Sequence, residues 1–271
     1  MVAACQKRVS FIIPWSDRPV LAATLKENRG LFSPDYSQVI IVNAGGNFSS
    51  LKDIVTESCI PNITVVNLEG AKFNKSCCLN IGVSHAEENI IFLLDCDVLI
   101  TKETVDNALA MLDLENFLTI RDGIESNPEA HPQVLNSLPW LKEKIVTTEF
   151  MLANGNSASF EFRQSSSGRS VGGLLLLNKK HYLSVEGADS QLEGWGFEDF
   201  DLQIRLQAML GIRRISTGYI THITHNTANF SDLQMNNLRN MKKCSTKYEH
   251  GNFLGSYSED VAQWGPKAKI F

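Results

Sequence analysis

The first half of the chain alternates short apolar runs with stretches whose apolar residues recur at helical spacing. Strands are predicted at Val9–Ile13, Gln38–Val42, Thr64–Asn67 and Asn89–Leu94, with Pro14 ending the first of them. Helices are predicted at Pro19–Asn28, Leu51–Thr56, Ser76–His85 and Lys102–Leu112. This order predicts an α/β fold in which a mostly parallel sheet is flanked by helices. Ligands on such sheets bind beyond the carboxyl ends of the strands, so a site is expected there.

The second half of the chain has a less regular pattern. After a strand at Phe117–Ile120, the segment Arg121–Gly168 contains scattered proline and serine and only patchy apolar residues. It is therefore predicted to be a partly mobile insertion rather than a separate domain. Further elements are predicted as a strand at Val171–Asn178, a helix at Lys179–Glu186, strands at Ile212–Ser216 and Tyr219–Thr224, and a last helix at Leu233–Lys243 before a polar end.

Three carboxylates, Glu198, Asp199 and Asp201, open an apolar run that stops at Gly211. The spacing of that run predicts a helix whose N-terminus carries the acids. Acids in this position can simply cap a helix and favour its dipole. One acid would suffice for that role, and Trp195 just ahead stands between two glycines that let the backbone hinge. We interpret the stretch as a binding site that contains a general base.

A second acidic group, Asp95 and Asp97, directly follows the strand Asn89–Leu94. Alternate carboxylates at the end of a parallel strand suit a hard divalent cation that also holds phosphate oxygens, although the same pattern occurs in surface turns. His222 and His225 are candidate partners for such a cation. On a regular strand their side chains point to opposite faces, so joint ligation requires a turn between them.

Composition narrows the classes of function. The 271 residues are 43% hydrophobic and carry a formal net charge of −5 without a basic tract, which argues against nucleic-acid binding. No apolar run reaches membrane-spanning length, and the first residues lack the apolar core of a signal peptide. The six cysteines show no zinc-site spacing and are interpreted as reduced thiols. A cytoplasmic protein is expected, although Asn-x-Ser/Thr triplets occur at Asn47, Asn62, Asn74 and Asn229.

Four segments, in the same order along the chain, resemble the β-1,4-galactosyltransferase family. They are IIPWSDR at 12–18, FNK with LNIG within 73–82, DCD at 95–97, and VGG at 171–173 with GWGFEDFD at 194–201. The matching family segments are IPFRNR, FNRAKLLNVG, DVD, and FGG with GWGGEDDD. Together they cover most of residues 8–230. The turn VNAGG at 42–46 resembles the bacterial family 2 glycosyltransferases instead, including chondroitin-polymerase-like enzymes.

This resemblance implies a GT-A fold and inverting transfer of a sugar from a UDP-sugar to a hydroxyl acceptor, expected to be a carbohydrate or glycoconjugate. The sugar is a hexose or N-acetylhexosamine, with the Gal/GalNAc type favoured. Residues 1–120 are expected to form the nucleotide-sugar-binding half, and residues 121–271 the acceptor-binding and catalytic half of the same domain. The membrane anchor of the Golgi members has no counterpart in this sequence.

Residue roles are carried over by position. Asp199 is expected to be the general base, with Glu198 holding the acceptor and Trp195 closing over both substrates. Asp97 and His225 are expected metal ligands, and Asp95 is expected to support the donor. The donor side is expected to comprise Pro14, Asp17, Arg18, Asn43, Asn74, Lys75, Asp95, Cys96, Asp97, Gly173 and Trp195, and the acceptor side Trp195, Phe197, Glu198 and Asp199.

Three departures from the family pattern bear on the metal and the substrates. His222 stands where the family has a methionine ligand, which favours Mn²⁺ and makes Mg²⁺ possible. Phe197 stands where the family has glycine, which changes the expected acceptor pocket. Ser170 stands where galactose-specific members have a bulky tyrosine beside the donor C2 substituent. The smaller serine predicts room for an N-acetyl group.

The expected chemistry agrees with the two acidic sites, since inverting transfer needs a base near the acceptor and a cation near the departing phosphates. Three alternatives remain open. A sugar nucleotidyltransferase has a similar sheet, but the loop after the first strand lacks the glycines usual for that class. A retaining glycosyltransferase is distinguished by the anomeric configuration of its product. A sugar-nucleotide-binding module without turnover is the third alternative.

Overall fold

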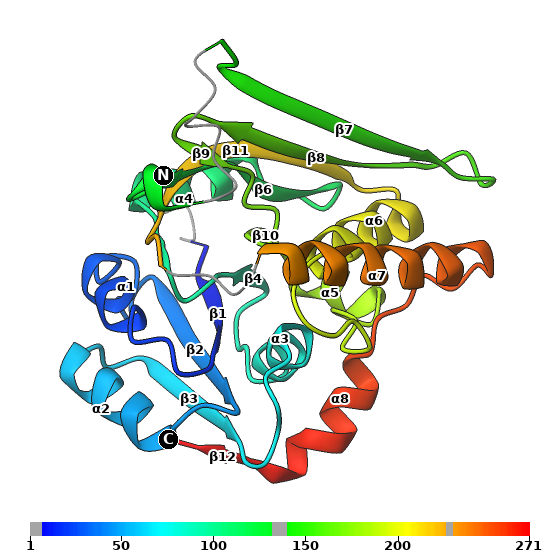
Figure 1. Ribbon diagram of the computed structural model, residues 1–271. Helices are drawn as coiled ribbons and strands as arrows, with labels where there is room; N and C mark the ends of the chain where they lie inside the picture. Colours follow the sequence, from blue (N-terminus) through cyan, green and yellow to red (C-terminus); the bar gives the residue numbers. More distant parts are fainter. Residues whose placement is uncertain (1–6, 132–139, 226–229) are drawn as a thin grey trace, which may run out of the picture.

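Alternate side chains of the central strands enter two separate cores, one on each face of the sheet. In β1, Phe11 and Ile13 belong to one core, whereas Ile12 belongs to the other. Helices α1, α2 and α4 contribute to the first core, and α3, α5, α6 and α8 contribute to the second (Figure 1). Because both faces are covered, the strands are apolar at nearly every position rather than at alternate ones.

The structure, a computed structural model, describes residues 7–131, 140–225 and 230–271. Its helices are α1 (Leu21–Glu27), α2 (Phe48–Ser58), α3 (Lys75–Ser84), α4 (Lys102–Met111), α5 (Lys179–Ser184), α6 (Glu198–Leu210), α7 (Phe230–Glu249) and α8 (Tyr257–Trp264), with 3₁₀ turns η1 (Pro128–Ala130) and η2 (Gly265–Lys267). Its strands are β1 (Val9–Trp15), β2 (Ser37–Ala44), β3 (Ile63–Leu68), β4 (Ile90–Leu93), β5 (Val98–Leu99), β6 (Asn116–Glu125), β7 (Glu143–Met151), β8 (Ser157–Ser165), β9 (Gly168–Arg169), β10 (Leu175–Asn178), β11 (Arg213–His222) and β12 (Ala268–Ile270).

The strands form one mixed sheet in the order β12-β3-β2-β1-β4-β10-β6-β9-β8-β7, with β11 pairing to both β5 and β6. Strands β3, β2, β1 and β4 are parallel neighbours, as are β6 and β11. Strand β10 runs antiparallel between β4 and β6. The predicted α/β architecture is confirmed, and the carboxyl ends of the parallel strands meet at one edge. The division at residue 120 falls inside β6, and the roles of the two halves stay a prediction.

The prediction that Arg121–Gly168 is irregular is wrong for most of the described part of that segment. Strand β6 continues to Glu125, and β7 and β8 form a long antiparallel hairpin. The apolar residues of β7 are largely exposed, so the segment lacks the core pattern from which a strand is recognised. Three of the aromatic residues that lie near the hairpin do pack together: Phe160 of β8 lies 4.5 Å from Phe200 of α6 and 6.0 Å from Phe197, between ring centroids.

Other boundaries also differ from the sequence prediction. Pro14 lies inside β1, where it is in register with Val42 of β2. Strand β4 pairs with β1 only as far as Ile12, so the missing N–H of Pro14 removes no hydrogen bond to β4. The two strands predicted at Ile212–Ser216 and Tyr219–Thr224 are one strand, β11, in which Gly218 takes a positive φ of 69°. The end of the chain was predicted as one helix and a polar tail, but it also forms α8 and the edge strand β12.

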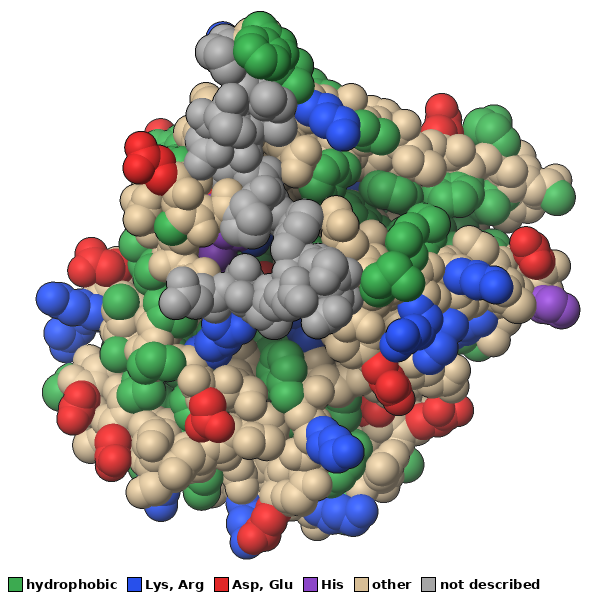
Figure 2. All heavy atoms as spheres, viewed as in Figure 1, with side chains coloured by type: hydrophobic (Ala, Val, Ile, Leu, Met, Phe, Trp, Pro, Cys, Tyr) green, Lys and Arg blue, Asp and Glu red, His purple; other side chains and the backbone are tan. Residues whose placement is uncertain are grey.

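The described residues also bear on the cysteines and on membrane-spanning helices. Cys59, Cys77, Cys78, Cys96 and Cys244 are free thiols, whereas Cys5, Asn229 and residues 132–139 lie outside the described part of the chain. Within that part, no helix has both the length and the apolar character needed to cross a membrane. On the face shown in Figure 2, basic and acidic side chains are interspersed and form no continuous basic track.

Candidate active site

Asp97, His222 and His225 meet beyond the end of β4. Strand β11 lies beside β5, and His222 is in register with Val98, the residue after Asp97. Nε2 of His225 lies 2.9 Å and Nε2 of His222 lies 3.6 Å from Oδ2 of Asp97. The chain leaves the strand after His222, which supplies the turn that brings both rings to one place. Their ligand atoms all lie within 4.8 Å of one another, a spacing that fits one cation.

The charges of this cluster stabilise one another. Burial alone would raise the pKa of Asp97, but hydrogen bonds from His222 and His225 hold it well below its usual range. Burial alone would lower the pKa of His222, but its hydrogen bonds to Asp97 and Glu125 raise it to about 9. Before a cation arrives, the His222 imidazole therefore supplies positive charge that offsets the charge of Asp97.

Glu125, which sequence reasoning missed, lies directly beside this cluster. It ends β6 in register with His222 of β11, and its Oε2 lies 2.7 Å from Nδ1 of His222. Its side chain is fully buried. It went unnoticed because it falls in the segment predicted to be irregular. A parallel pairing of β6 with β11 would have revealed it, but a single sequence gives no signal for that pairing.

Glu198 and Asp199 begin α6 and are held there by the backbone ahead of them. Phe197 takes a left-handed conformation with φ 71° at the helix start, and the N–H of Gly196 donates to Oε2 of Glu198 at 2.7 Å. Glycine at 196 has φ 108°, and a Cβ there would lie 2.7 Å from Cβ of Asn237 on α7. Gly196 thus permits the close approach of α7 to the backbone that begins α6, where Glu198 is buried and Asp199 is partly buried.

Lys75 connects the two acidic sites. At the start of α3, its Nζ lies 2.9 Å from Oδ1 of Asp95 and 3.2 Å from Oδ1 of Asp199. Asn74 precedes it as the helix cap, since Oδ1 of Asn74 accepts from the N–H of Cys77 at 2.9 Å and its amide donates to the carbonyl of Ser190. Asn74 therefore helps to fix where Lys75 projects, and its predicted contact with the donor stays a prediction.

Burial shifts the pKa values of Glu198, Asp199 and Lys75. It raises the pKa of Glu198 to about 7, helped by the charge of Asp199 and opposed by Lys75. It also raises the pKa of Asp199, and there Lys75 is the main opposing influence. For Lys75, burial would lower the pKa, but Asp199 and Asp95 raise it well above the usual value. Lys75 is thus a permanent cation that favours an ionised, base-competent Asp199.

Gly173 and Trp195 complete the surroundings of the base. A Cβ built at Gly173 would lie 2.5 Å from Oδ2 of Asp199 and 2.7 Å from Nζ of Lys75, so only glycine leaves room for that pair. Trp195 is 42% exposed, which leaves its indole at the surface as expected of a closing aromatic. Both positions agree with the roles predicted for them, which remain proposals.

The other predicted donor residues divide into two groups. Nη1 of Arg18 donates to Nδ1 of His225 at 3.0 Å, so Arg18 reaches the metal cluster. Asp17, Asn43 and Cys96 are engaged within the fold. Oδ1 of Asp17 accepts from the N–H of Asn47, Asn43 is buried and donates to Asn67, and the buried Cys96 offers its carbonyl to Thr24. Pro14 is buried in β1.

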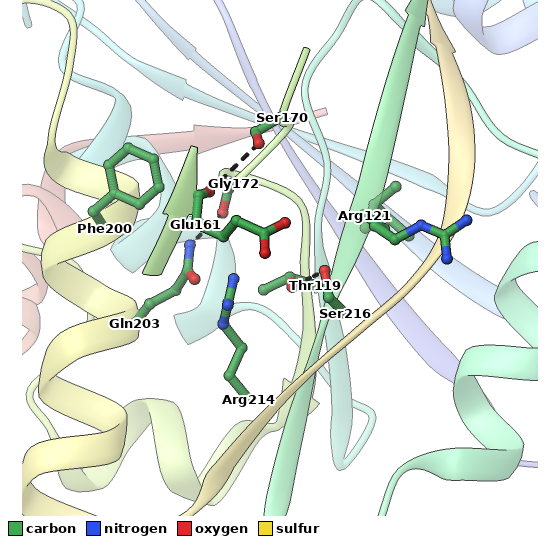
Figure 3. A pocket seen from close by; sticks show the side chains of 10 residues that line it. Thr119, Arg121, Glu161, Ser170, Gly172, Phe200, Gln203, Arg214 and Ser216 are labelled. Carbon is green, nitrogen blue, oxygen red and sulfur yellow. Dashed lines mark hydrogen bonds between the residues drawn. The ribbon is translucent and has the colours of Figure 1, made fainter. Parts of the chain in front are cut away.

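Phe197 and Ser170, the two residues predicted to affect substrate specificity, pack against other parts of the fold. Phe197 is 5% exposed and packs with Phe160 and Phe200, so in this structure its ring supports the β7–β8 hairpin rather than lining an acceptor pocket. Ser170 lines a small polar pocket together with Glu161, Phe200 and Gln203 (Figure 3). Its Oγ accepts from the N–H of Arg163 at 2.6 Å and donates to the carbonyl of Glu161 at 3.4 Å.

The hydrogen bonds of Ser170 run to β8, and its predicted place beside an N-acetyl group stays a prediction. The pocket beside it has a volume of about 10 Å³, which is room for about one water molecule. The sequence comparison was correct that serine is smaller than tyrosine, but it could not reveal that strand β8 occupies the space beside it.

Solved structures of three glycosyltransferases resemble this fold. A mannosyltransferase from Pyrobaculum calidifontis, in complex with GDP-Man and Mn²⁺, matches with a TM-score of 0.60 at 16% identity over 90% of this chain and 65% of its own. GalNAc-T7 with UDP, GalNAc and Mn²⁺ matches with a TM-score of 0.62 at 13% identity over 89% and 48%. S. aureus TarS residues 1–349 match with a TM-score of 0.52 at 17% identity over 80% and 60%. These similarities confirm the expected GT-A fold.

The chain spans less than two thirds of each of these proteins. Comparison with curated protein sequences gives no match. A family model described as glycosyltransferase like family 2 matches residues 10–234, a range that contains Asp97, Asp199 and His222 together with most of the sheet. The chain therefore belongs to glycosyltransferase-like family 2.

Proposed function

We propose that this protein is an inverting, metal-dependent glycosyltransferase that moves a hexose or N-acetylhexosamine from a nucleotide-sugar, with UDP as the favoured nucleotide, to a hydroxyl of a carbohydrate acceptor. The observation that carries the proposal is the position of Lys75. It contacts Asp199, the candidate base, and also Asp95, two residues before the candidate metal ligand Asp97. An acceptor-side base and a donor-side cation site are thus joined by a single side chain.

The chemistry of inversion assigns a task to each group. Asp199 accepts the proton of the acceptor hydroxyl as that oxygen attacks the anomeric carbon from the side opposite the nucleotide. Glu198, whose raised pKa keeps part of it protonated near neutral pH, can donate as well as accept a hydrogen bond and so can orient acceptor hydroxyls. Holding the two substrates in line contributes much of the rate in such reactions.

The donor set of the candidate cation site fits Mn²⁺. One carboxylate oxygen and two imidazole nitrogens suit a borderline divalent cation, and Mg²⁺ is a possible replacement. Asp97, His222 and His225 would hold the ion, which when bound neutralises charge on the departing phosphates. Lys75 and Arg18 add fixed positive charge on the same side. The neighbouring proteins hold Mn²⁺ with GDP-Man or with UDP and GalNAc, which supports a cation on the nucleotide side.

Hydrolysis of nucleotide-sugars tests the proposal without knowledge of the acceptor. Purified protein is incubated with UDP-Gal, UDP-GalNAc, UDP-Glc, UDP-GlcNAc and GDP-Man, each with Mn²⁺ or with chelator, and release of the nucleotide diphosphate is measured. We expect Mn²⁺-dependent turnover of a UDP-sugar, lost in Asp97→Ala and His225→Ala. Glu103→Gln, an exposed first-turn acid of α4, is the control and should behave as wild type. Absence of turnover with every donor would contradict the proposal, and release of a sugar phosphate would indicate a nucleotidyltransferase.

The stereochemistry needs a second measurement. With the best donor from the screen and an array of mono- and disaccharide acceptors, the anomeric configuration of the product is determined by NMR. We expect inversion relative to the donor. Retention would leave the glycosyltransferase assignment intact and would remove the role of Asp199 as an acceptor-side base.

A further inference from the structure

The carboxylate of Glu125 is surrounded by four groups that can donate hydrogen bonds. Its Oε2 lies 2.7 Å from Nδ1 of His222 and accepts from the hydroxyl of Thr224 at 3.0 Å. Its Oε1 accepts from Nε of Arg169 at 3.2 Å and lies 3.6 Å from Nε2 of His131. A buried carboxylate with donors on both oxygens is fixed in position and stays charged.

The fold brings Glu125 to His222 through strand register. Strand β11 pairs in parallel with β6, which puts His222 opposite Glu125, and pairs antiparallel with β5, which puts His222 opposite Val98 next to Asp97. The imidazole therefore lies between two carboxylates that approach its two different nitrogens. Nδ1 faces Glu125, and Nε2 faces Asp97 at 3.6 Å.

Glu125, His131 and His222 are also close enough together to hold a cation of their own. The geometry opposes that function, because the Arg169 side chain lies against the carboxylate oxygen on the His131 side. A cation there would face a permanent positive charge at close range. Glu125 is thus better suited to act on His222 than to bind a metal.

His225 provides a contrast within the same cluster. Its Nδ1 faces the guanidinium of Arg18, which can only donate, so Nδ1 accepts and the proton of the neutral ring lies on Nε2, toward Asp97. With a proton on Nε2, His225 cannot bind a cation through that nitrogen. The proton must first move to Nδ1, and Arg18 must move away from Nδ1 for this to happen. His222 needs no such change of tautomer, because its Nδ1 faces a carboxylate that accepts a hydrogen bond from Nδ1–H.

We propose that Glu125 is a positioning residue for the metal site: by accepting a hydrogen bond from Nδ1–H of His222, it orients the ring and directs the Nε2 lone pair toward the cation held with Asp97. This inference rests on the proposed metal dependence. It explains how a histidine replaces the methionine that resembling enzymes have at this position. A thioether carries no proton and needs no tautomer control, whereas an imidazole ligand needs a partner for its second nitrogen.

The test measures binding of Mn²⁺ alone and of Mn²⁺ with UDP, by the loss of the free-ion EPR signal. Glu125→Gln, which removes the negative charge of the partner, should weaken Mn²⁺ binding on the order of 10–100-fold, the usual effect of mutating a residue that hydrogen-bonds to a ligating histidine. Glu161→Gln is the matched control, since Glu161 also pairs with an arginine, Arg163, but lies outside the cluster. The double variant Glu125→Gln/His222→Ala should bind no more weakly than His222→Ala, because Glu125 acts only through that ring.

Two measurements separate positioning from support of the fold. A purely structural role would lower the melting temperature of Glu125→Gln without changing the Kd for Mn²⁺, and that result would overturn the proposal. Additive losses in the double variant would overturn it as well. Should the variant fail to fold, nitrogen NMR of the wild type loaded with Zn²⁺, a diamagnetic probe, decides: the proton of His222 must lie on Nδ1, and a proton on Nε2 refutes the inference.

The proposed transferase function and the positioning role of Glu125 can be refuted independently of each other. Mn²⁺ binding that depends on Glu125, in a protein that turns over no nucleotide-sugar, would leave the positioning role standing and remove the transferase assignment. A wild type that binds no Mn²⁺ with or without UDP would refute the positioning role.

Discussion

Nζ of Lys75 lies 3.2 Å from Oδ1 of Asp199, and both side chains are partly buried at the start of their helices. The contact links α3 of the first half of the chain to α6 of the second. It gives the candidate base a permanent countercharge, and through Asp95 it also links the base to the nucleotide side. The expected behaviour of several variants follows from this arrangement.

Asp199→Asn should fold and bind nucleotide but transfer poorly. The amide preserves the shape of the side chain and removes the proton acceptor, a loss on the order of 10²–10⁴-fold in kcat. The measurement is single-turnover transfer with the best donor, beside calorimetric titration of UDP in the presence of Mn²⁺. Turnover near the wild-type rate would rule out Asp199 as the base.

Lys75→Met should shift the pH dependence of transfer. Lys75 is the chief influence that lowers the pKa of Asp199 against burial, so its loss raises that pKa further. The ionised base is then lost at a higher pH, and the acidic limb of the kcat/KM profile moves upward. Lys72→Met, an exposed lysine three residues earlier, is the control. An acidic limb at the wild-type position in Lys75→Met would show that Lys75 does not control Asp199.

Glu198 should make the protein less stable as pH rises toward neutrality. Burial and the neighbouring charge of Asp199 raise its folded pKa from 4.5 to about 7, while Lys75 opposes them. Below about pH 4.5, Glu198 is protonated in both the folded and the unfolded state. Between about pH 4.5 and pH 7, Glu198 releases its proton only in the unfolded state, so the free energy of unfolding falls as the pH rises. Glu198→Gln should flatten this decline. Urea unfolding at several pH values from 4 to 8 checks it, and equal slopes in both proteins would contradict it.

The sequence predicted the central sheet and both acidic sites, since these rest on apolar runs and on motifs at strand and helix ends. Lys75 contacts both Asp95 and Asp199, so the two acidic motifs lie close together, and their roles stay a prediction. Glu125 and the β7–β8 hairpin were missed for a common reason. Their positions depend on pairing between strands far apart in the chain, and an exposed hairpin such as β7–β8 has no core pattern of its own.

Ser170 is the converse case, in which alignment identifies a residue but gives no information about its surroundings. Because its hydroxyl bonds to the backbone of β8, Ser170→Ala should leave the preference between UDP-GalNAc and UDP-Gal unchanged and should loosen the hairpin. Comparison of kcat/KM for the two donors tests the first part, and hydrogen exchange of the hairpin amides tests the second. A changed donor ratio would restore Ser170 to the donor pocket.

Gly173→Ala should separate activity from stability. The new Cβ would lie 2.5 Å from Oδ2 of Asp199 and 2.7 Å from Nζ of Lys75, so the ends of these two side chains must move. Side-chain ends move at little cost to folding, but a displacement of about 1 Å in a reacting group can reduce the rate on the order of 10²-fold. Gly30→Ala is the matched control, because a Cβ there meets no atom within 4 Å. We expect both variants to melt close to wild type, with transfer reduced only in Gly173→Ala. Full activity in Gly173→Ala would mean that the Lys75–Asp199 contact can be displaced without cost, and the catalytic importance of that contact would then be refuted.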